Sequence, residues 1–535
     1  MGKDIPIIEN KNNQWIFLLP LTIMSVLAIA LFSFFGINRS IWFDEACSVF
    51  EAGHDWEGII REVKLTESSP PLYFLFLAVW IRIFGISELA VRSPSAIFYM
   101  LSLVAVYVLG KSIYNDRKTG LLCSFLYMLS PLAIKHAQNA RMYSLLGLLV
   151  ILSTLFFLRL FLLKNNSKKD LALYIIVNMI GIFTHYWFFF MIFSQIVSHL
   201  LLFPRSSFKK FSVAIFISVA PFLILWIPVF LSQANRTHVS WIVKPGIREL
   251  VSTLFDFCGG VNWKRAVLVY VAFLVLIVFK VVGFKIRFWN ISALKEFIIQ
   301  KQNPVFLIFL SVSLLVPLII SQAKPIYVPT RYTIIALPPF VMLVGSLLSR
   351  FGNSRIIIAC CYILLIETSI SFVGYRFTPK QCTDKSTTEY LIKHADNNDI
   401  LIHTSLSLRP IDYYLSLMKS DKAFIKISFP QELALHPGWR DVNKMLSQKQ
   451  ILESDADSVV SYINDILIKN NNAKIWLLYG HDTEIGEILK HRLDTRFFSR
   501  KVKDLRKPFY KFYYNYTFRD DNCTFYNKLF VYKKR

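Results

Sequence analysis

The segment IWFDEACS, residues 41–48, closely follows the first long apolar run of the chain, Trp15 to Ile37. It places two adjacent carboxylates, Asp44 and Glu45, beside two large aromatic rings at the expected boundary between membrane and water. A carboxylate near hydrocarbon is costly and tends to mark a functional position. We therefore take Asp44 and Glu45 as the first candidate catalytic residues.

The composition is that of a helical membrane protein. Of 535 residues, 54% are hydrophobic, and the mean hydropathy is +0.46, which is unusual for a soluble chain of this length. The formal charge of +25 lies largely in short loops between apolar runs, where Lys and Arg set topology, so it argues against a nucleic-acid-binding protein. The apolar runs predict about eleven spans, at residues 15–37, 88–110, 119–135, 141–163, 170–184, 186–203, 211–231, 265–284, 304–322, 332–350 and 355–374.

One further apolar run, residues 71–86, is too short to span easily, follows Pro70 and contains Arg82. Loops rich in Lys and Arg usually lie in the cytoplasm. All five basic loops of this chain fall on the cytoplasmic side only if residues 71–86 do not cross the membrane. We therefore predict a juxtamembrane helix within a first outer loop, residues 38–87. The chain is then a multi-pass protein of the inner (plasma) membrane with a cytoplasmic N-terminus.

The chain changes character after residue 374. Strand-like segments at 399–403, 424–427, 473–479 and 528–532 alternate with helical stretches at 383–395 and 454–469. This alternation predicts a transmembrane module, residues 1–374, followed by a soluble extracytoplasmic α/β domain, residues 375–535. Cys382 and Cys523 flank the predicted domain, and an oxidising compartment would permit a disulfide between them, although the sequence does not determine the pairing.

The predicted topology gathers ionisable residues at the outer ends of apolar helices, where they indicate function. A carboxylate held among Trp42, Phe43 and Phe50 is partly desolvated, which raises its basicity and suits it to take a proton from a hydroxyl group. Adjacent residues on a helix point about 100° apart, so Asp44 and Glu45 have different roles. Glu45 either supports Asp44, binds a divalent cation or caps a helix. From the residues alone, base and cap remain equally good interpretations of the pair.

Several motifs, in order, resemble those of the bacterial membrane glycosyltransferases of the GT-C fold, the relatives of protein O-mannosyltransferases and of the lipid A aminoarabinose transferase. The resemblance covers roughly residues 10–375. It rests on the segments Trp42–Ala46, Pro70–Tyr73, Phe84–Arg92, Ser130–Leu145, Thr184–Tyr186 and Pro329–Pro338.

The resemblance implies transfer of a hexose or pentose from a polyprenyl-phosphate-linked donor to a lipid, glycan or protein acceptor outside the cytoplasm. It places Asp44 at the reaction centre, and we expect an inverting reaction. One position differs, because many relatives read His-Pro-Pro-Leu where this chain reads Ser69-Pro70-Pro71-Leu72. Glu67, two residues earlier, is a candidate substitute for the lost imidazole.

A lipid-phosphate leaving group needs cationic donors, and the forked N–H groups of Arg suit a phosphate. The alternative for each Arg is a side chain that reaches from a helix end to the interface. His and Tyr side chains are further candidates for contacts with the substrate. No Gly-rich phosphate loop is present, which argues against a nucleotide-sugar donor. The candidates are Arg141, Tyr143, Arg331, Tyr332 and Arg92 for the donor phosphate, and His136, His185, Tyr186 and Glu67 for the substrate.

Two other classes of protein remain as alternatives. A secondary transporter or lipid flippase would need internal repeats and broken helices near the midplane, and the sequence has no evident repeat. A membrane-anchored binding protein would place all function in residues 375–535, which leaves the polar residues at the outer helix ends without a role.

Overall fold

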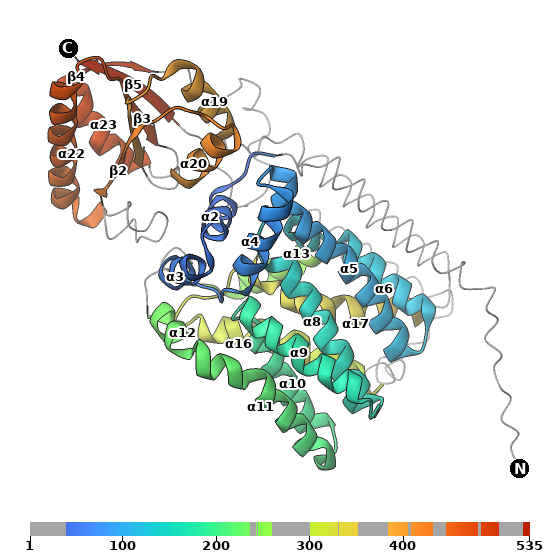
Figure 1. Ribbon diagram of the computed structural model, residues 1–535. Helices are drawn as coiled ribbons and strands as arrows, with labels where there is room; N and C mark the ends of the chain where they lie inside the picture. The colour runs from blue at the N-terminus through green and yellow to red at the C-terminus, as the bar shows by residue number, and fades with distance from the viewer. Residues whose placement is uncertain are drawn as a thin grey trace, which may run out of the picture.

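The computed structural model describes residues 39–235, 242, 244–258, 300–329, 331–350, 384–404, 408–431, 446–479, 483–501 and 528–534. The predicted spans 15–37, 265–284 and 355–374 lie outside these ranges, as do Cys382 and Cys523. Figure 1 shows a helical body and a C-terminal α/β domain that lies beside helix α2.

The helical body contains most of the apolar runs. Among the described residues, five helical segments are long and apolar enough to cross a membrane, or six if the bent pair α6 and α7 forms one span. The helices of the body are α2 (Phe43–Ala52), α3 (Trp56–Thr66), α4 (Leu72–Phe84), α5 (Glu88–Tyr114), α6 (Arg117–Leu129), α7 (Pro131–Ala137), α8 (Tyr143–Phe157), α9 (Lys168–Thr184), α10 (Phe188–Leu202), α11 (Phe208–Leu225), α12 (Ile227–Ala234), α13 (Ile247–Cys258), α16 (Asn303–Ile320) and α17 (Leu337–Arg350). A π-helical turn, η2 (Leu158–Leu162), extends α8, and 3₁₀ segments η3 (Arg205–Ser207) and η4 (Tyr332–Ala336) precede α11 and α17.

Helix α4 occupies the short run that the charge pattern excludes from the spans. It has 13 residues, which corresponds to about 20 Å against a hydrocarbon thickness of about 30 Å. It ends at Gly85, whose φ of +78° is a conformation that favours glycine. Its length therefore agrees with a juxtamembrane helix.

The break between α6 and α7 shapes the candidate site. Ser130 ends α6, and Pro131 begins α7 because a proline fits the first turn of a helix, where no backbone N–H is needed. The two helices are bent by 64°. The bend carries residues 136–141 back toward α2.

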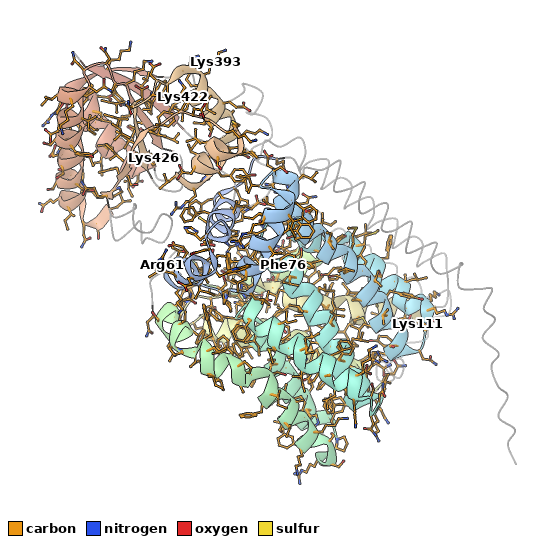
Figure 2. All side chains as sticks on the ribbon, in the orientation of Figure 1. Arg61, Phe76, Lys111, Lys393, Lys422 and Lys426 are labelled. Carbon is orange, nitrogen blue, oxygen red and sulfur yellow. The ribbon has the colours of Figure 1, made fainter. Side chains whose placement is uncertain are left out.

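Glycines allow α5 and α6 to pack closely. A Cβ atom at Gly110 would lie 2.8 Å from the Cα of Gly120, and one at Gly120 would lie 2.7 Å from the carbonyl oxygen of Tyr107. Such distances leave no space for a side chain. Figure 2 shows Lys111, near the end of α5, on the opposite side of the helical body from Arg61 of the first loop.

The C-terminal domain is built on a five-stranded sheet with the order β2-β1-β3-β5-β4. Strand β1 pairs in parallel with β2 and β3, whereas β5 pairs antiparallel with β3 and β4. Its elements are α19 (Asp384–His394), β1 (Ile400–Thr404), α20 (Leu408–Leu417), β2 (Ile425–Phe429), α22 (Lys449–Lys469), β3 (Ile475–Tyr479), α23 (Thr483–Arg496), β4 (Phe497–Lys501) and β5 (Lys528–Lys534). Four strands coincide with the segments expected from the sequence, and β4 is additional.

Alternating strand residues form two cores. Ile400 and Ile402 pack with α22 and α23, and Leu401 packs with α19 and α20 on the other face, as the period of two in a strand requires. The α20 side of the domain contacts the helical body (Figure 1). There the backbone N–H of Ile41 donates to the Tyr414 hydroxyl at 2.6 Å, and Lys385 pairs with Glu88 at 2.9 Å.

Candidate active site

Asp44 lies in the first turn of α2 and is partly buried. Its Oδ2 is 3.0 Å from Nη1 of Arg331, and the Arg331 guanidinium lies over the Trp42 ring at 5.2 Å from the ring centroid. The two charged residues are 287 positions apart in the chain. The structure thus brings two of the predicted site residues into direct contact.

Glu45 points away from Asp44 into a fully occupied polar site. It is 1% exposed, and its Oε1 accepts from Nε of Arg92 and from the Ala140 N–H, each at 2.8 Å. Its Oε2 accepts from Nη2 of Arg92 at 2.6 Å and from the Trp42 N–H at 3.3 Å. Glu45 therefore connects α2 to α5 and to residues 138–141. These contacts favour a structural role for Glu45 over a catalytic one. They also pair Arg92 with a carboxylate of the protein itself.

The donors around Glu45 do not suit a metal ion. Each of its oxygens already accepts two hydrogen bonds, and Arg92 supplies the neutralising charge. Within the described ranges, no group of three His, Cys, Asp or Glu side chains is arranged to hold a metal. We derive no step that uses a cation.

Arg141 lies buried behind α2 and pairs with Glu67. Its Nη1 is 2.8 Å from Glu67 Oε1, and its Nη2 is 3.2 Å from Oε2. Nη1 also donates to the Ser48 hydroxyl at 2.9 Å and to the Asp44 carbonyl at 3.3 Å. Ser69, where many relatives have His, donates to Glu67 at 3.3 Å. Glu67 thus positions Arg141 against the helix turn that carries Asp44.

An aromatic cluster adjoins Arg331. The ring of Tyr143 lies 4.6 Å from His136, 5.9 Å from His185 and 6.1 Å from Tyr332, measured between centroids. His185 lies 5.0 Å from Tyr332. Four predicted side chains from three separate parts of the chain therefore meet beside the candidate carboxylate.

His185 is neutral in this cluster. Burial, followed by the positive charge of Arg141, lowers the pKa of His185 from 6.5 to about 3. Its Nδ1 accepts the backbone N–H of Trp187 at 3.1 Å, so the proton of the neutral ring is on Nε2. The imidazole is consequently a hydrogen-bond donor at neutral pH.

Tyr186 is not brought into the cluster through its hydroxyl group. That hydroxyl donates to Gln233 and accepts from Nε1 of Trp226 at 2.9 Å, and Gln233 in turn donates to the Val63 carbonyl at 2.9 Å. The Tyr186 hydroxyl therefore helps to join α10, α11 and α12 to α3.

Sequence reasoning did not identify four residues that share a cleft with Asp44. They are Cys47, Glu51, Thr66 and Arg409. The helical spacing from Asp44 to Glu51 is a usable signal, because residues seven apart lie on nearly the same side of a helix. Arg409 belongs to α20 of the other domain, and no local pattern points to it.

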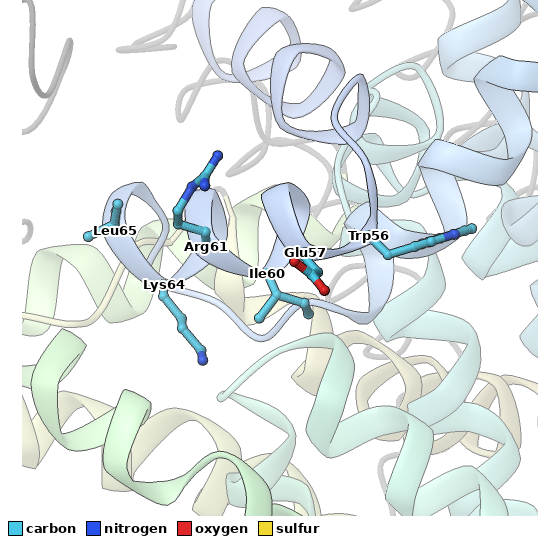
Figure 3. A pocket seen from close by; sticks show the side chains of 6 residues that line it. All are labelled: Trp56, Glu57, Ile60, Arg61, Lys64 and Leu65. Carbon is cyan, nitrogen blue, oxygen red and sulfur yellow. The ribbon is translucent and has the colours of Figure 1, made fainter.

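A separate hollow of about 560 Å³ lies along α3 and is shown in Figure 3. Trp56 is 52% exposed and Leu65 44% exposed there, and Arg61 and Lys64 lie between them. This mixture of apolar and basic side chains is typical of a helix at a membrane interface. The hollow contains none of the predicted catalytic residues.

Comparison with known proteins supports this architecture. Residues 68–231 match the sequence model of a family described as dolichyl-phosphate-mannose-protein mannosyltransferase. Apo ArnT from Cupriavidus metallidurans superposes with a TM-score of 0.60 at 10% identity, and the match covers 98% of each chain. The same protein bound to undecaprenyl phosphate gives a TM-score of 0.56 at 11% identity over 97% of this chain and 98% of that one.

The apo oligosaccharyltransferase of Archaeoglobus fulgidus gives a TM-score of 0.52 at 11% identity, over 92% of this chain and 74% of that one. No curated protein sequence matches the chain. At these identities the solved structures establish the fold. The GT-C fold expected from the order of the motifs is confirmed.

Proposed function

We propose that this GT-C protein transfers a sugar from a polyprenyl-phosphate-linked donor to a hydroxyl group of a lipid, glycan or protein acceptor on the extracytoplasmic side of the membrane. The observation that carries the proposal is the contact between Asp44 and Arg331 at 3.0 Å. It combines a candidate base with a phosphate-binding cation, next to a cluster of hydrogen-bond donors. The match of ArnT in its complex with undecaprenyl phosphate supports a lipid-phosphate carrier.

In the proposed reaction, the acceptor oxygen attacks the anomeric carbon of the donor, and its proton passes to Asp44. The bond between that carbon and the phosphate oxygen breaks, and its electron pair leaves with the polyprenyl phosphate. Attack from the face opposite to the leaving group inverts the anomeric configuration. The bound proton is then released from Asp44 to water.

Arg331 has two tasks in this scheme. Before the donor binds, its guanidinium neutralises Asp44. With the donor bound, the guanidinium contacts the phosphate oxygens and stabilises the charge that develops as the carbon–oxygen bond breaks. His185, through its Nε2–H, and the hydroxyl groups of Tyr143 and Tyr332 supply neutral donors to the phosphate or the sugar.

Arg141 supports the site from behind. Its hydrogen bonds to the Asp44 carbonyl and to Ser48 hold the first turns of α2, and Glu67 fixes its orientation. The nearby charge of Arg141 also favours a phosphate. Its role is therefore to position α2 and to add to the positive potential at the donor site.

The decisive experiment compares wild type with Asp44→Asn in lipid nanodiscs, using a panel of undecaprenyl-phosphate-linked hexoses and pentoses. We expect wild type to release undecaprenyl phosphate and Asp44→Asn to lose at least about a hundredfold in rate, because the amide cannot accept the proton. Asp457→Asn, at an exposed carboxylate of α22, is the matched control. Full activity in Asp44→Asn contradicts the proposal. Donor movement across liposomes without any sugar release would favour a transporter.

A further inference from the structure

A narrow cleft separates α2 and the end of α3 from α20 of the C-terminal domain. Its enclosed space is about 20 Å³, enough for one group of the size of a hydroxyl. Asp44 forms part of its wall. The cleft is lined by Phe43, Asp44, Cys47, Phe50, Glu51, Thr66, Glu67 and Arg409.

Glu51 presents an unsatisfied polar atom to this cleft. The side chain is 3% exposed; its Oε1 accepts from the Thr66 hydroxyl at 2.9 Å, whereas its Oε2 has no hydrogen-bond partner in the described part of the chain. Leaving such an atom buried and unpaired is destabilising. A ligand hydroxyl that binds this atom would remove the destabilisation.

Glu51 is suited to bind a hydroxyl without competing for its proton. Burial, followed by the negative charge of Glu67, raises the pKa of Glu51 well above its usual range, which favours the neutral acid. A neutral carboxyl can donate its own O–H to an incoming oxygen. Asp44 lies seven residues earlier on nearly the same side of α2, about 10 Å away along the helix axis, so the two carboxyl groups meet different oxygens of one ligand.

Arg409 brings a positive charge to the same cleft. Its guanidinium lies 3.4 Å from the centroid of the Phe50 ring. Asp44 and Glu67 are neutralised by Arg331 and Arg141, whereas Arg409 makes no ion pair with a carboxylate in the ranges that the structure describes. The two ion pairs are each neutral overall, so the charge of Arg409 gives the cleft a net positive charge. This charge favours an anionic ligand.

Resting on the proposed function, we propose that this cleft binds the acceptor. The reacting hydroxyl of the acceptor contacts Asp44, a second hydroxyl contacts Glu51, and a phosphate or carboxylate group binds Arg409. The acceptor site is then shared between the helical body and the C-terminal domain. Arg409 determines the preference for an anionic acceptor. No bond changes at Glu51 or Arg409; the reacting hydroxyl loses its proton to Asp44.

The binding test uses the full chain in nanodiscs with saturating undecaprenyl phosphate, so that the donor phosphate site is filled. Three probes with similar hydroxyl groups are titrated by calorimetry: glycerol, glycerate and glycerol 3-phosphate. We expect the two anions to bind wild type about tenfold more tightly than glycerol does. Arg409→Gln abolishes this preference, and Glu51→Gln weakens the binding of all three.

The control for Arg409→Gln is Arg61→Gln, which removes an exposed arginine of the α3 surface and keeps the preference. If Arg409→Gln still binds the two anions more tightly than glycerol, the proposal is overturned. Because Arg409 is only half-buried, we expect this variant to fold, so it tests the proposal even if Glu51→Gln does not fold. Nanodiscs made of phosphatidylglycerol are compared with nanodiscs made of phosphatidylcholine, to distinguish a lipid acceptor from a soluble one. If the acceptor is a lipid, phosphatidylglycerol competes with glycerol 3-phosphate for the cleft and phosphatidylcholine does not.

A parallel measurement separates this proposal from the proposed function. If wild type releases no undecaprenyl phosphate from any donor but Arg409→Gln still loses the anion preference, the cleft binds anionic hydroxyl compounds and the glycosyltransferase assignment fails. If wild type turns over donor but binds all three probes equally, the transferase assignment stands and the acceptor cleft is wrong.

Discussion

Asp44 and Glu45 are neighbours with opposite surroundings. The Asp44 side chain is partly exposed and meets Arg331 at the edge of an aromatic cluster, whereas Glu45 is buried with both oxygens saturated. A difference of about 100° around the helix axis is enough to send one side chain to the cleft and the other into the body. Under the proposed function, Asp44 takes part in the chemistry, whereas the next residue of the same helix turn, Glu45, anchors the helix.

We predict that Glu45→Gln destabilises the protein, whereas Asp44→Asn does not. The substitution removes the carboxylate that pairs with the buried Arg92, and breaking such a pair costs roughly 3–5 kcal/mol. Thermal unfolding in detergent is the measurement. A melting temperature for Glu45→Gln equal to that of wild type would show that the pair with Arg92 is not structural.

His185 makes stability depend on pH. Its pKa is about 3 in the folded chain and near 6.5 when unfolded, so the unfolded state binds more protons between these values. The neutral imidazole therefore makes its whole contribution to the free energy of unfolding above about pH 6.5, and this contribution decreases as the pH falls toward 3.

We expect wild type to lose about 1.4 kcal/mol per pH unit relative to His185→Gln as the pH falls from about 6 to about 4. Unfolding of both proteins in the same detergent is followed across this range. Glu51 and the other titrating groups are common to both, so the difference reports His185. Parallel stability curves would contradict the assignment of a neutral buried imidazole.

At the level of helices, close packing in the body supports the site. α5 carries Arg92 at one end, and α6 leads into the bend that presents residues 136–141, so the crossing of α5 and α6 fixes how these two parts of the site meet α2. Gly110 and Gly120 allow that crossing. A small displacement there would be transmitted to the hydrogen bonds of Glu45, because packed helices move as rigid bodies.

Gly120→Ala should lower stability by roughly 1–3 kcal/mol, since the new Cβ would meet backbone atoms of α5 at 2.7 Å and 3.0 Å. Gly246→Ala is the matched control, because the nearest atom to its Cβ would be Glu249 Oε2 at 3.6 Å. Thermal unfolding of the two variants gives the comparison. Equal melting temperatures would show that the α5–α6 contact tolerates a methyl group.

Across the whole molecule, the C-terminal domain is joined to the body next to the candidate site. The Tyr414 hydroxyl accepts from Ile41 N–H, three residues before Asp44, and the Tyr413 hydroxyl donates to the Ile86 carbonyl at 2.6 Å. This junction explains how a residue of α20 reaches the cleft of α2. The proposed topology requires the domain and the first loop to lie on the same side of the membrane.

Cysteine labelling in intact cells tests that topology in a background in which all seven native cysteines are replaced by Ser. Arg61→Cys, on the exposed surface of α3, should react with a membrane-impermeant maleimide from outside. Asn115→Cys, in the turn between α5 and α6, should react only after the membrane is permeabilised, because the proposed topology places this basic loop in the cytoplasm. External labelling of Asn115→Cys would invert the topology and place Asp44 in the cytoplasm.

Hydrophobic length and the order of the motifs suffice to predict a GT-C membrane protein, the short helix of the first loop and the candidate role of Asp44, since these signals are local in the chain. Which carboxylate each arginine pairs with cannot be predicted from nearby residues in the chain. Arg92, Arg141 and Arg331 are chemically equivalent residues at the ends of apolar segments, and the sequence offers all three as candidates for the donor phosphate, with Arg92 as the third.

Only the packing of the helices pairs Arg92 with Glu45, Arg141 with Glu67 and Arg331 with Asp44. The position of Arg409 in the cleft likewise depends on how two separately folded parts dock. A charged side chain selects its partner by distance and burial, which are set by the tertiary structure, because the energy of an ion pair depends on both.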